Sequence, residues 1–268
     1  MRTIGYIAVN VFKESVRDKV LYNLVIFAVL LIAVSLLLGQ LTAGQDIKII
    51  KDLGLAAISL FGLFIAVFIG IGLVSKEVER RSIYSLLSKP VRREEFIAGK
   101  YLGLVLTLLV NVTVMTAAYY AVLASMAWAA GGWFKPAWEA PAVDPALLKA
   151  IAMIFLQLMM VTALALLFST FTSPILATAL TFGLYVVGHF NADLKHFETI
   201  VPSKPVVWLA RLLYYLLPNL SRLDVKAQVV HALPVPAGYM VLSTTYALAY
   251  VGALLVLATL IFMRRDFK

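Results

Sequence analysis

The chain has 268 residues, of which 62% are hydrophobic and only 14% are charged, and its mean hydropathy is +0.94. This composition excludes an ordinary soluble domain and is typical of an integral membrane protein. The formal net charge of +9 does not indicate nucleic-acid binding, because basic residues in a membrane protein first report its topology. The absence of cysteine excludes disulfides and thiolate metal sites.

Residues 2–19 are predicted to form an amphipathic helix. Apolar side chains recur there at helical spacing, and charged residues fall on the other side of the helix. The apolar positions are Ile4, Ile7, Ala8, Val11, Phe12 and Val16. We expect this helix to lie on the inner membrane surface, since a mobile polar tail would leave the apolar stripe without a place to be buried.

Six transmembrane helices are predicted next, because a spanning helix needs about 20 mostly apolar residues. The uncharged stretch over residues 150–192 is long enough for two crossings. Ser173-Pro174 divides it, because proline starts helices readily and disfavours helix in the residue before it. The expected fold is therefore a single all-α transmembrane domain over residues 1–268. Its spans are expected at about residues 20–40, 53–75, 101–128, 149–171, 174–192 and 237–263.

Charged residues are distributed unevenly along this pattern. Lys and Arg are concentrated in the short segments before the first span, between the second and third spans, and after the last one. By the positive-inside rule, both termini are cytoplasmic. The apolar stretches contain no Asp, Glu, Lys or Arg, groups that ion-coupled carriers usually hold inside the membrane. The pattern therefore disfavours a self-powered secondary transporter. Polar residues in the spans, such as Gln157, are expected to form interhelical hydrogen bonds.

The segment over residues 76–100 is rich in charge but also contains an amphipathic core. Ile83, Leu86 and Leu87 fall at i, i+3 and i+4, which predicts a short helix that Pro90 ends. A second helix is predicted from about Arg92, with acidic residues in its first turn. A solvated loop that only sets topology would account for the charge but not for the apolar face. The pattern therefore favours a docking element for a cytosolic partner.

Residues 79–100, ERRSIYSLLSKPVRREEFIAGK, resemble the loop between the second and third spans of ABC-2 type transporter permeases. The family's pattern is an acidic residue, a small pair, Leu-Leu followed shortly by Pro and an aliphatic residue, then Ser-Arg, an acidic residue and Gly-Lys. Arg81-Ser82 replaces a common Gly-Thr, and Arg92 replaces a helix-capping Ser, so the second helix lacks its usual side-chain cap. Within the family, the chain looks most like the single-domain permeases of the gliding-motility and nitrous-oxide-reductase-maturation type.

The resemblance implies a permease subunit of an ABC transporter in the plasma membrane of a prokaryote. Residues 79–88 would be the coupling helix, which in the family sits in a cleft of a cytosolic ABC ATPase. A second permease chain, identical or different, is implied as well. The residues expected to couple to the ATPase are Glu77, Glu79, Arg80, Arg81, Ser82, Ile83, Leu86, Leu87, Pro90, Arg93, Glu94, Gly99 and Lys100.

No phosphate-binding loop is present in the sequence, so ATP and Mg are expected on the partner ATPase and this chain is not expected to be an enzyme. ATP hydrolysis would then drive export or conformational work across the membrane. Two alternatives stay open from the residues. One is a membrane scaffold or assembly factor that binds a cytosolic partner but moves nothing, and the other is an intramembrane enzyme that uses His189.

Before the last span, the apolar run over residues 206–217 is too short to cross the membrane and is stopped by Pro218. It predicts a re-entrant or interfacial helix. The resemblance implies re-entrant helices here on the outer side, where they could close the exit of the pathway as an outer gate. Simple anchoring of the loop in the membrane is an equal alternative. The candidate gate residues are Trp208, Arg211, Tyr214, Tyr215 and Pro218.

His189, Asp193 and His196 stand at i, i+4 and i+7 near the end of the predicted fifth span. Imidazole and carboxylate groups on one helix face are compatible with a metal site, or with an intramembrane enzyme that uses His189. We favour polar residues at a membrane edge, and no metal is expected.

Overall fold

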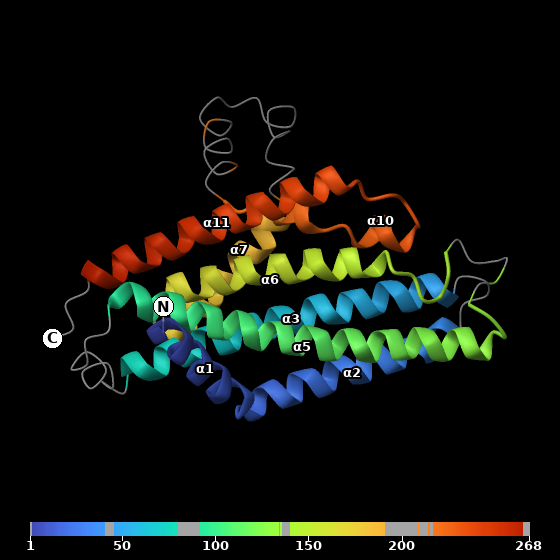
Figure 1. Cartoon of the computed structure of the whole chain (residues 1–268), viewed down its shortest axis with the longest axis horizontal. Helices are drawn as coiled ribbons and strands as arrows, with labels where there is room; N and C mark the ends of the chain where they lie inside the picture. The colour runs from blue at the N-terminus through green and yellow to red at the C-terminus, as the bar shows by residue number, and fades with distance from the viewer. Residues whose placement is uncertain are drawn as a thin grey trace.

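The computed structural model of the protein describes residues 2–40, 46–79, 92–133, 135, 140–190, 208, 214 and 217–264. Within these residues every regular element is a helix and no strand occurs, in agreement with the predicted all-α fold. The elements are α1 (Arg2–Val16), α2 (Lys19–Gln40), α3 (Asp46–Glu79), α5 (Arg93–Ala129), α6 (Leu147–Ser169), α7 (Pro174–His189), η2 (Leu220–Leu223), α10 (Lys226–Val230) and α11 (Ala237–Arg264) (Figure 1).

Five of these helices, namely α2, α3, α5, α6 and α11, are long and apolar enough to cross a membrane. They run along the long axis of the molecule (Figure 1). The shortest candidate span has 21 residues, which corresponds to about 32 Å of helix and matches a hydrocarbon core of about 30 Å. These helices lie where the sequence predicts the first four spans and the last one.

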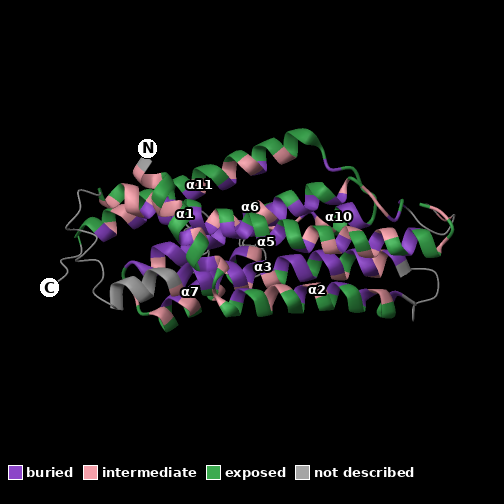
Figure 2. Ribbon diagram, turned by 60° about the horizontal axis from the view of Figure 1, so that its bottom comes forward, coloured by how far each residue is buried: buried purple, intermediate pink, exposed green. Residues whose placement is uncertain are grey.

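The distribution of burial is that of a membrane bundle. α3 and α6 form its centre, whereas α2 and α11 expose most of their residues along the flanks (Figure 2). The exposed side chains on these flanks are largely apolar, for example Phe27, Leu37, Val241 and Leu242. Because such a surface would be unfavourable in water, it indicates contact with lipid or with another apolar helix.

α7 is shorter than the predicted fifth span. Pro174 is its first residue and Ser173 its extended N-cap, as the sequence predicts, but the helix has only 16 residues, or about 24 Å. It ends at His189, whose side chain contacts Gln157 of α6. Along the axis of α6, Gln157 lies about 18 Å before the last residue of that helix. α7 therefore reaches only about halfway along α6.

The segment from residue 217 continues the path that α7 begins. Pro218 and Leu220 pack on Gly188, where a Cβ atom would lie 2.9 Å from both the Pro218 carbonyl oxygen and the Leu220 side chain. α10 then packs against α3 and α6, and Pro234 shares a cavity with Asp144 just before α6. The chain thus returns to the end of the bundle where α6 begins before α11 starts. We call this the α10 end, and the opposite one the α1 end.

α1 is an amphipathic helix, as predicted, but its apolar stripe packs against α5. At Gly99 a Cβ atom would lie 2.8 Å from Ile7, and at Gly103 it would lie 2.6 Å from Val11. These two glycines form a G-x-x-x-G pair, which lets two helix backbones approach closely. Protein therefore covers this stripe, and the exposed apolar side chains of α1 include Tyr6 and Val9. The position of α1 on the inner membrane surface stays a prediction.

Candidate functional site

The predicted coupling segment connects α3 to α5 at the α1 end. Residues 80–91 lie outside the described residues, and so do the side chains of Glu77 and Glu79, although both belong to the last turns of α3. The contacts expected between the coupling helix and an ATPase therefore stay a prediction. What the structure describes is the root of the segment on the α5 side, including Arg93, Glu94, Gly99 and Lys100.

Arg93, the first residue of α5, is bound to the last turn of α11. Its Nη1 atom donates to the carbonyl oxygens of Phe262, at 3.1 Å, and Met263, at 2.8 Å. The last carbonyls of a helix have no partner within the helix and carry partial negative charge, so a guanidinium is favourable there. The guanidinium carbon also lies 6.0 Å from the centroid of the Phe262 ring. Arg93 thus caps α11 from another helix.

Aromatic contacts extend this joint. The rings of Phe96 and Phe262 stack with centroids 5.7 Å apart and an interplanar angle of 17°. The Nζ atom of Lys100 lies 5.0 Å from the centroid of the Phe96 ring, and the Lys100 side chain is only 1% exposed. We call Arg93, Phe96, Lys100 and Phe262 the α5–α11 joint. It connects the root of the coupling segment to the end of the last helix.

The first turns of α5 therefore contact α11 through the joint and α1 through Gly99 and Gly103, and the Tyr101 hydroxyl donates to the Met159 carbonyl oxygen of α6. The start of α5 also agrees with the sequence analysis in two details. Its first turn contains Glu94 and Glu95, and its N-cap, Arg92, makes no side-chain cap hydrogen bond. The observed contacts of Gly99 and Lys100 are made within the bundle, and their predicted role in ATPase coupling is not tested by them.

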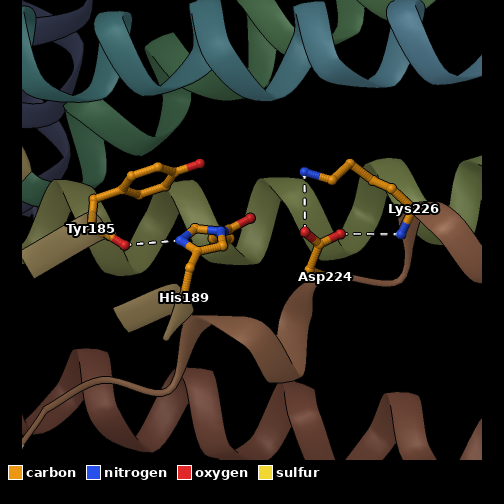
Figure 3. A network of polar contacts seen from close by, with 5 residues as sticks. Tyr185, His189, Asp224 and Lys226 are labelled. Atoms are coloured by element: carbon orange, nitrogen blue, oxygen red, sulfur yellow. Dashed lines mark hydrogen bonds and ion pairs between the residues drawn. The ribbon is translucent and has the colours of Figure 1, made fainter. Parts of the chain in front are cut away.

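A second polar cluster lies where α7 ends (Figure 3). The Nδ1 atom of His189 is 2.8 Å from the carbonyl oxygen of Tyr185, and its Nε2 atom is 2.8 Å from Nε2 of Gln157. Because a carbonyl only accepts, Nδ1 carries the proton, and Nε2 accepts from the Gln157 amide. The remaining Gln157 oxygen is buried and has no hydrogen-bond partner within the part of the chain that the structure describes.

This cluster connects three helices and leads toward a charged pair. The ring centroids of Tyr185 and His189 are 4.5 Å apart, and Ser59 of α3 lies near the Tyr185 hydroxyl. Beyond them, the carboxylate of Asp224 binds the Nζ atom of Lys226 at 3.3 Å (Figure 3). Since the charges of Asp224 and Lys226 balance, this pair adds no net charge to the cluster.

The interhelical hydrogen bond predicted for Gln157 is confirmed by its contact with His189. For most other polar residues of the spans the prediction was wrong, because their side chains donate to carbonyl oxygens four residues earlier in the same helix. These residues are Thr107, Asn111, Thr113, Thr162, Thr178 and Thr181.

Two other groups of predicted site residues are described only in part. Asp193 and His196 lie outside the described residues, and within those residues no group of three or more His, Cys, Asp or Glu side chains is arranged to hold a metal ion. Of the candidate gate, Trp208 is exposed and Pro218 is buried, whereas Arg211 and Tyr215 are not described. The re-entrant helix stays a prediction.

The architecture defines a multi-pass helical membrane protein with a structured joint at the root of a charged loop. The family profile of the ABC-2 family transporter proteins matches residues 6–267. The chain therefore belongs to the ABC-2 transporter family, which confirms the resemblance to this family found in the sequence, whereas the subgroup stays a prediction. This family supplies the membrane component of ABC transporters. No curated protein matches the chain at a significant level.

Proposed function

We propose that the chain is the permease subunit of an ABC transporter and couples ATP hydrolysis by a separate cytosolic ATPase to export or to conformational work across the membrane. Membership of the ABC-2 family supports the permease role. The observation that carries the coupling role is the bond from Arg93 to the end of α11, because it connects the root of the coupling segment to a helix that crosses the whole bundle.

The proposal includes six crossings within a single transmembrane domain over residues 1–268. α7 and the segment from residue 217 together complete the fifth crossing, since α11 starts at the α10 end and finishes at the α1 end. With six crossings, both termini lie on one side. The short basic segments gather at the α1 end, which makes it the cytoplasmic end by the positive-inside rule. The membrane proposed is the plasma membrane of a prokaryote.

Movement would pass from the ATPase into the bundle through three contacts. The coupling segment continues directly into α3, a central helix of the bundle. Through the α5–α11 joint it acts on α11, and through Gly99 and Gly103 it acts on α1. Close-packed contacts of this kind transmit displacement because the interior is not freely deformable. Two permease chains, alike or different, would enclose the substrate pathway.

The first test is affinity purification of the chain from its native membrane in mild detergent, with mass spectrometry of the co-purifying proteins. We expect a soluble ATPase at near-equal stoichiometry. The double charge reversal Arg80→Glu with Arg81→Glu is expected to remove it while the permease still inserts. The matched control is Lys13→Glu with Lys19→Glu, which makes the same charge change at exposed positions near the same end.

A non-transporting scaffold or assembly factor would also bind a cytosolic partner, so co-purification alone does not separate the two functions. They differ in energy use, because only the transporter converts ATP hydrolysis into movement of a substrate or into work on a partner. Recovery of the intact permease without any nucleotide-binding protein, in several detergents, would contradict the permease proposal.

A further inference from the structure

A groove of about 440 Å³ runs between the start of α5 and the end of α11, beside the α5–α11 joint. Its size lies within the usual range of roughly 300–1,000 Å³ for ligand sites. Glu94 and Ile97 line it from α5, and Leu255, Val256, Leu260 and Met263 line it from α11. Apart from Glu94, which is one of the predicted coupling residues, the function proposed above gives the residues of this groove no role.

The groove changes in polarity along its length. Glu94 and Met263, in the terminal turns of their helices, mark one end, and Leu255 lies about 12 Å further along α11. Thr259 adds no free donor, because its hydroxyl donates to the Leu255 carbonyl oxygen at 2.8 Å. One end therefore presents a carboxylate at the level of the basic residues near the membrane surface, and the rest is apolar.

Glu94 is the only charged side chain among the groove-lining residues that the structure describes. It is exposed, and it has no ion-pair partner among the described residues, while its neighbour Arg93 is bound to α11. It lies in the first turn of α5, where the partial positive charge of a helix N-terminus attracts negative groups. The apolar wall is also accessible from the side, since Val256 is 60% exposed and Leu260 49%.

We propose that this groove binds a phospholipid with a primary amine in its headgroup, such as phosphatidylethanolamine, with its ammonium group on Glu94 and an acyl chain along Ile97, Val256 and Leu260. A primary ammonium donates charge-assisted hydrogen bonds to a carboxylate, whereas a trimethylammonium group has no N–H to donate. An anionic headgroup would be repelled. Arg264 follows Met263 at the same end and offers positive charge near the lipid phosphate.

This inference goes beyond the proposed function. It depends on that function only for the membrane leaflet from which the lipid comes, which is the inner leaflet when the α1 end is cytoplasmic. A lipid at this place would lie against the helices that the α5–α11 joint connects. Its occupancy would therefore influence how rigidly the end of α11 follows the start of α5.

The test uses the purified full-length chain and native mass spectrometry. The chain is equilibrated with equal amounts of phosphatidylethanolamine, phosphatidylcholine and phosphatidylglycerol that carry the same acyl chains, so that only the headgroup differs. We expect preferential retention of phosphatidylethanolamine by about fivefold, a modest factor because the ion pair is partly exposed to solvent. Glu94→Gln is expected to remove the preference.

Two further variants distinguish lipid binding in the groove from general effects of a substitution on lipid retention. Glu95→Gln removes the adjacent carboxylate, which does not line the groove, and is expected to keep the preference. Ala98→Leu narrows the groove and is expected to lower retention of all three lipids. Equal retention of the three headgroups by the unmodified chain would overturn the proposal, and so would an equal loss of preference in Glu94→Gln and Glu95→Gln.

Another occupant is also detectable. If no lipid is retained and a cysteine at Met263→Cys cross-links two copies of the chain, the groove is an interface between permeases and the lipid proposal is wrong. The experiment needs no ATPase, so its failure is distinguishable from failure of the proposed function. The latter is measured separately by co-purification.

Discussion

Arg93 and Phe262 lie in direct contact although 169 residues separate them in the chain, and the Arg93 guanidinium donates to the Phe262 carbonyl oxygen at 3.1 Å. One residue begins α5 and the other belongs to the last turn of α11. The contact closes the bundle at the α1 end, directly beside the coupling segment. It joins the end of α11 to the start of α5.

Replacing Arg93 by Met is expected to destabilise the protein by about 1–2 kcal/mol, because it removes two charge-assisted hydrogen bonds to carbonyl oxygens in the last turn of α11. Thermal unfolding of the purified chain in detergent measures this loss. Arg92→Met is the matched control, since Arg92 is exposed and makes no side-chain cap bond. An equal decrease of the melting temperature in both variants would show that Arg93 does not cap α11.

Replacing glycine by alanine is expected to have opposite effects at two positions. One position lies in the contact between α1 and α5, and the other lies in α11. Gly103→Ala is expected to cost about 1–3 kcal/mol, because the new Cβ atom would lie 2.6 Å from Val11 Cβ and 2.7 Å from the Ala8 carbonyl oxygen. Gly252→Ala meets no atom within 4 Å and is expected to stabilise α11 by about 0.5–1 kcal/mol. Chemical unfolding compares the two variants, and a stable Gly103→Ala protein would contradict the close packing of α1 on α5.

The pair of Gln157 and His189 predicts strong coupling between two substitutions. His189→Leu leaves the Gln157 amide without its partner in the interior and is expected to cost about 1–3 kcal/mol. The double variant Gln157→Leu with His189→Leu is expected to be more stable than His189→Leu alone, because both polar groups are then removed together. Unfolding free energies of the two single variants and the double variant form the cycle. Additive effects would mean that the two side chains do not interact.

The six-crossing topology is testable with single cysteines, because the chain has none of its own. A membrane-impermeant maleimide applied to intact cells is expected to label Gln228→Cys and Lys149→Cys, which lie at the α10 end. It is expected to label Lys13→Cys and Arg264→Cys only after the membrane is permeabilised. Labelling of Lys13→Cys and Gln228→Cys from the same side would contradict the fifth crossing.

Local patterns account for the part of the fold that the sequence predicted. The candidate spans depend on apolar length, the start of α7 on Pro174, and the uncapped start of α5 on Arg92, so each is encoded within a few residues. The early end of α7 is different. Nothing in the apolar run marks His189 as a terminus, because the helix stops where Gln157, Pro218 and Leu220 meet it from distant parts of the chain.

The candidate site likewise has features that the sequence predicted and contacts that it did not. The family pattern included Arg93, Gly99 and Lys100, but not their contacts, which are made with distant helices. One signal was available in the sequence, since Gly99 and Gly103 have the spacing of a close helix contact. The bond from Arg93 to α11 had no such signal, because an arginine that caps a remote helix leaves no periodic pattern.

The central claim, that this chain couples a separate ATPase to the membrane through the root of the coupling segment, is tested most directly by ATP turnover. The rate of ATP hydrolysis is measured for the ATPase alone and for its complex with the permease in lipid nanodiscs. We expect the permease to change the turnover, Arg80→Glu with Arg81→Glu to prevent the complex, and Arg93→Met to keep the complex but reduce the effect on turnover. Turnover that is identical with and without bound permease would contradict the account.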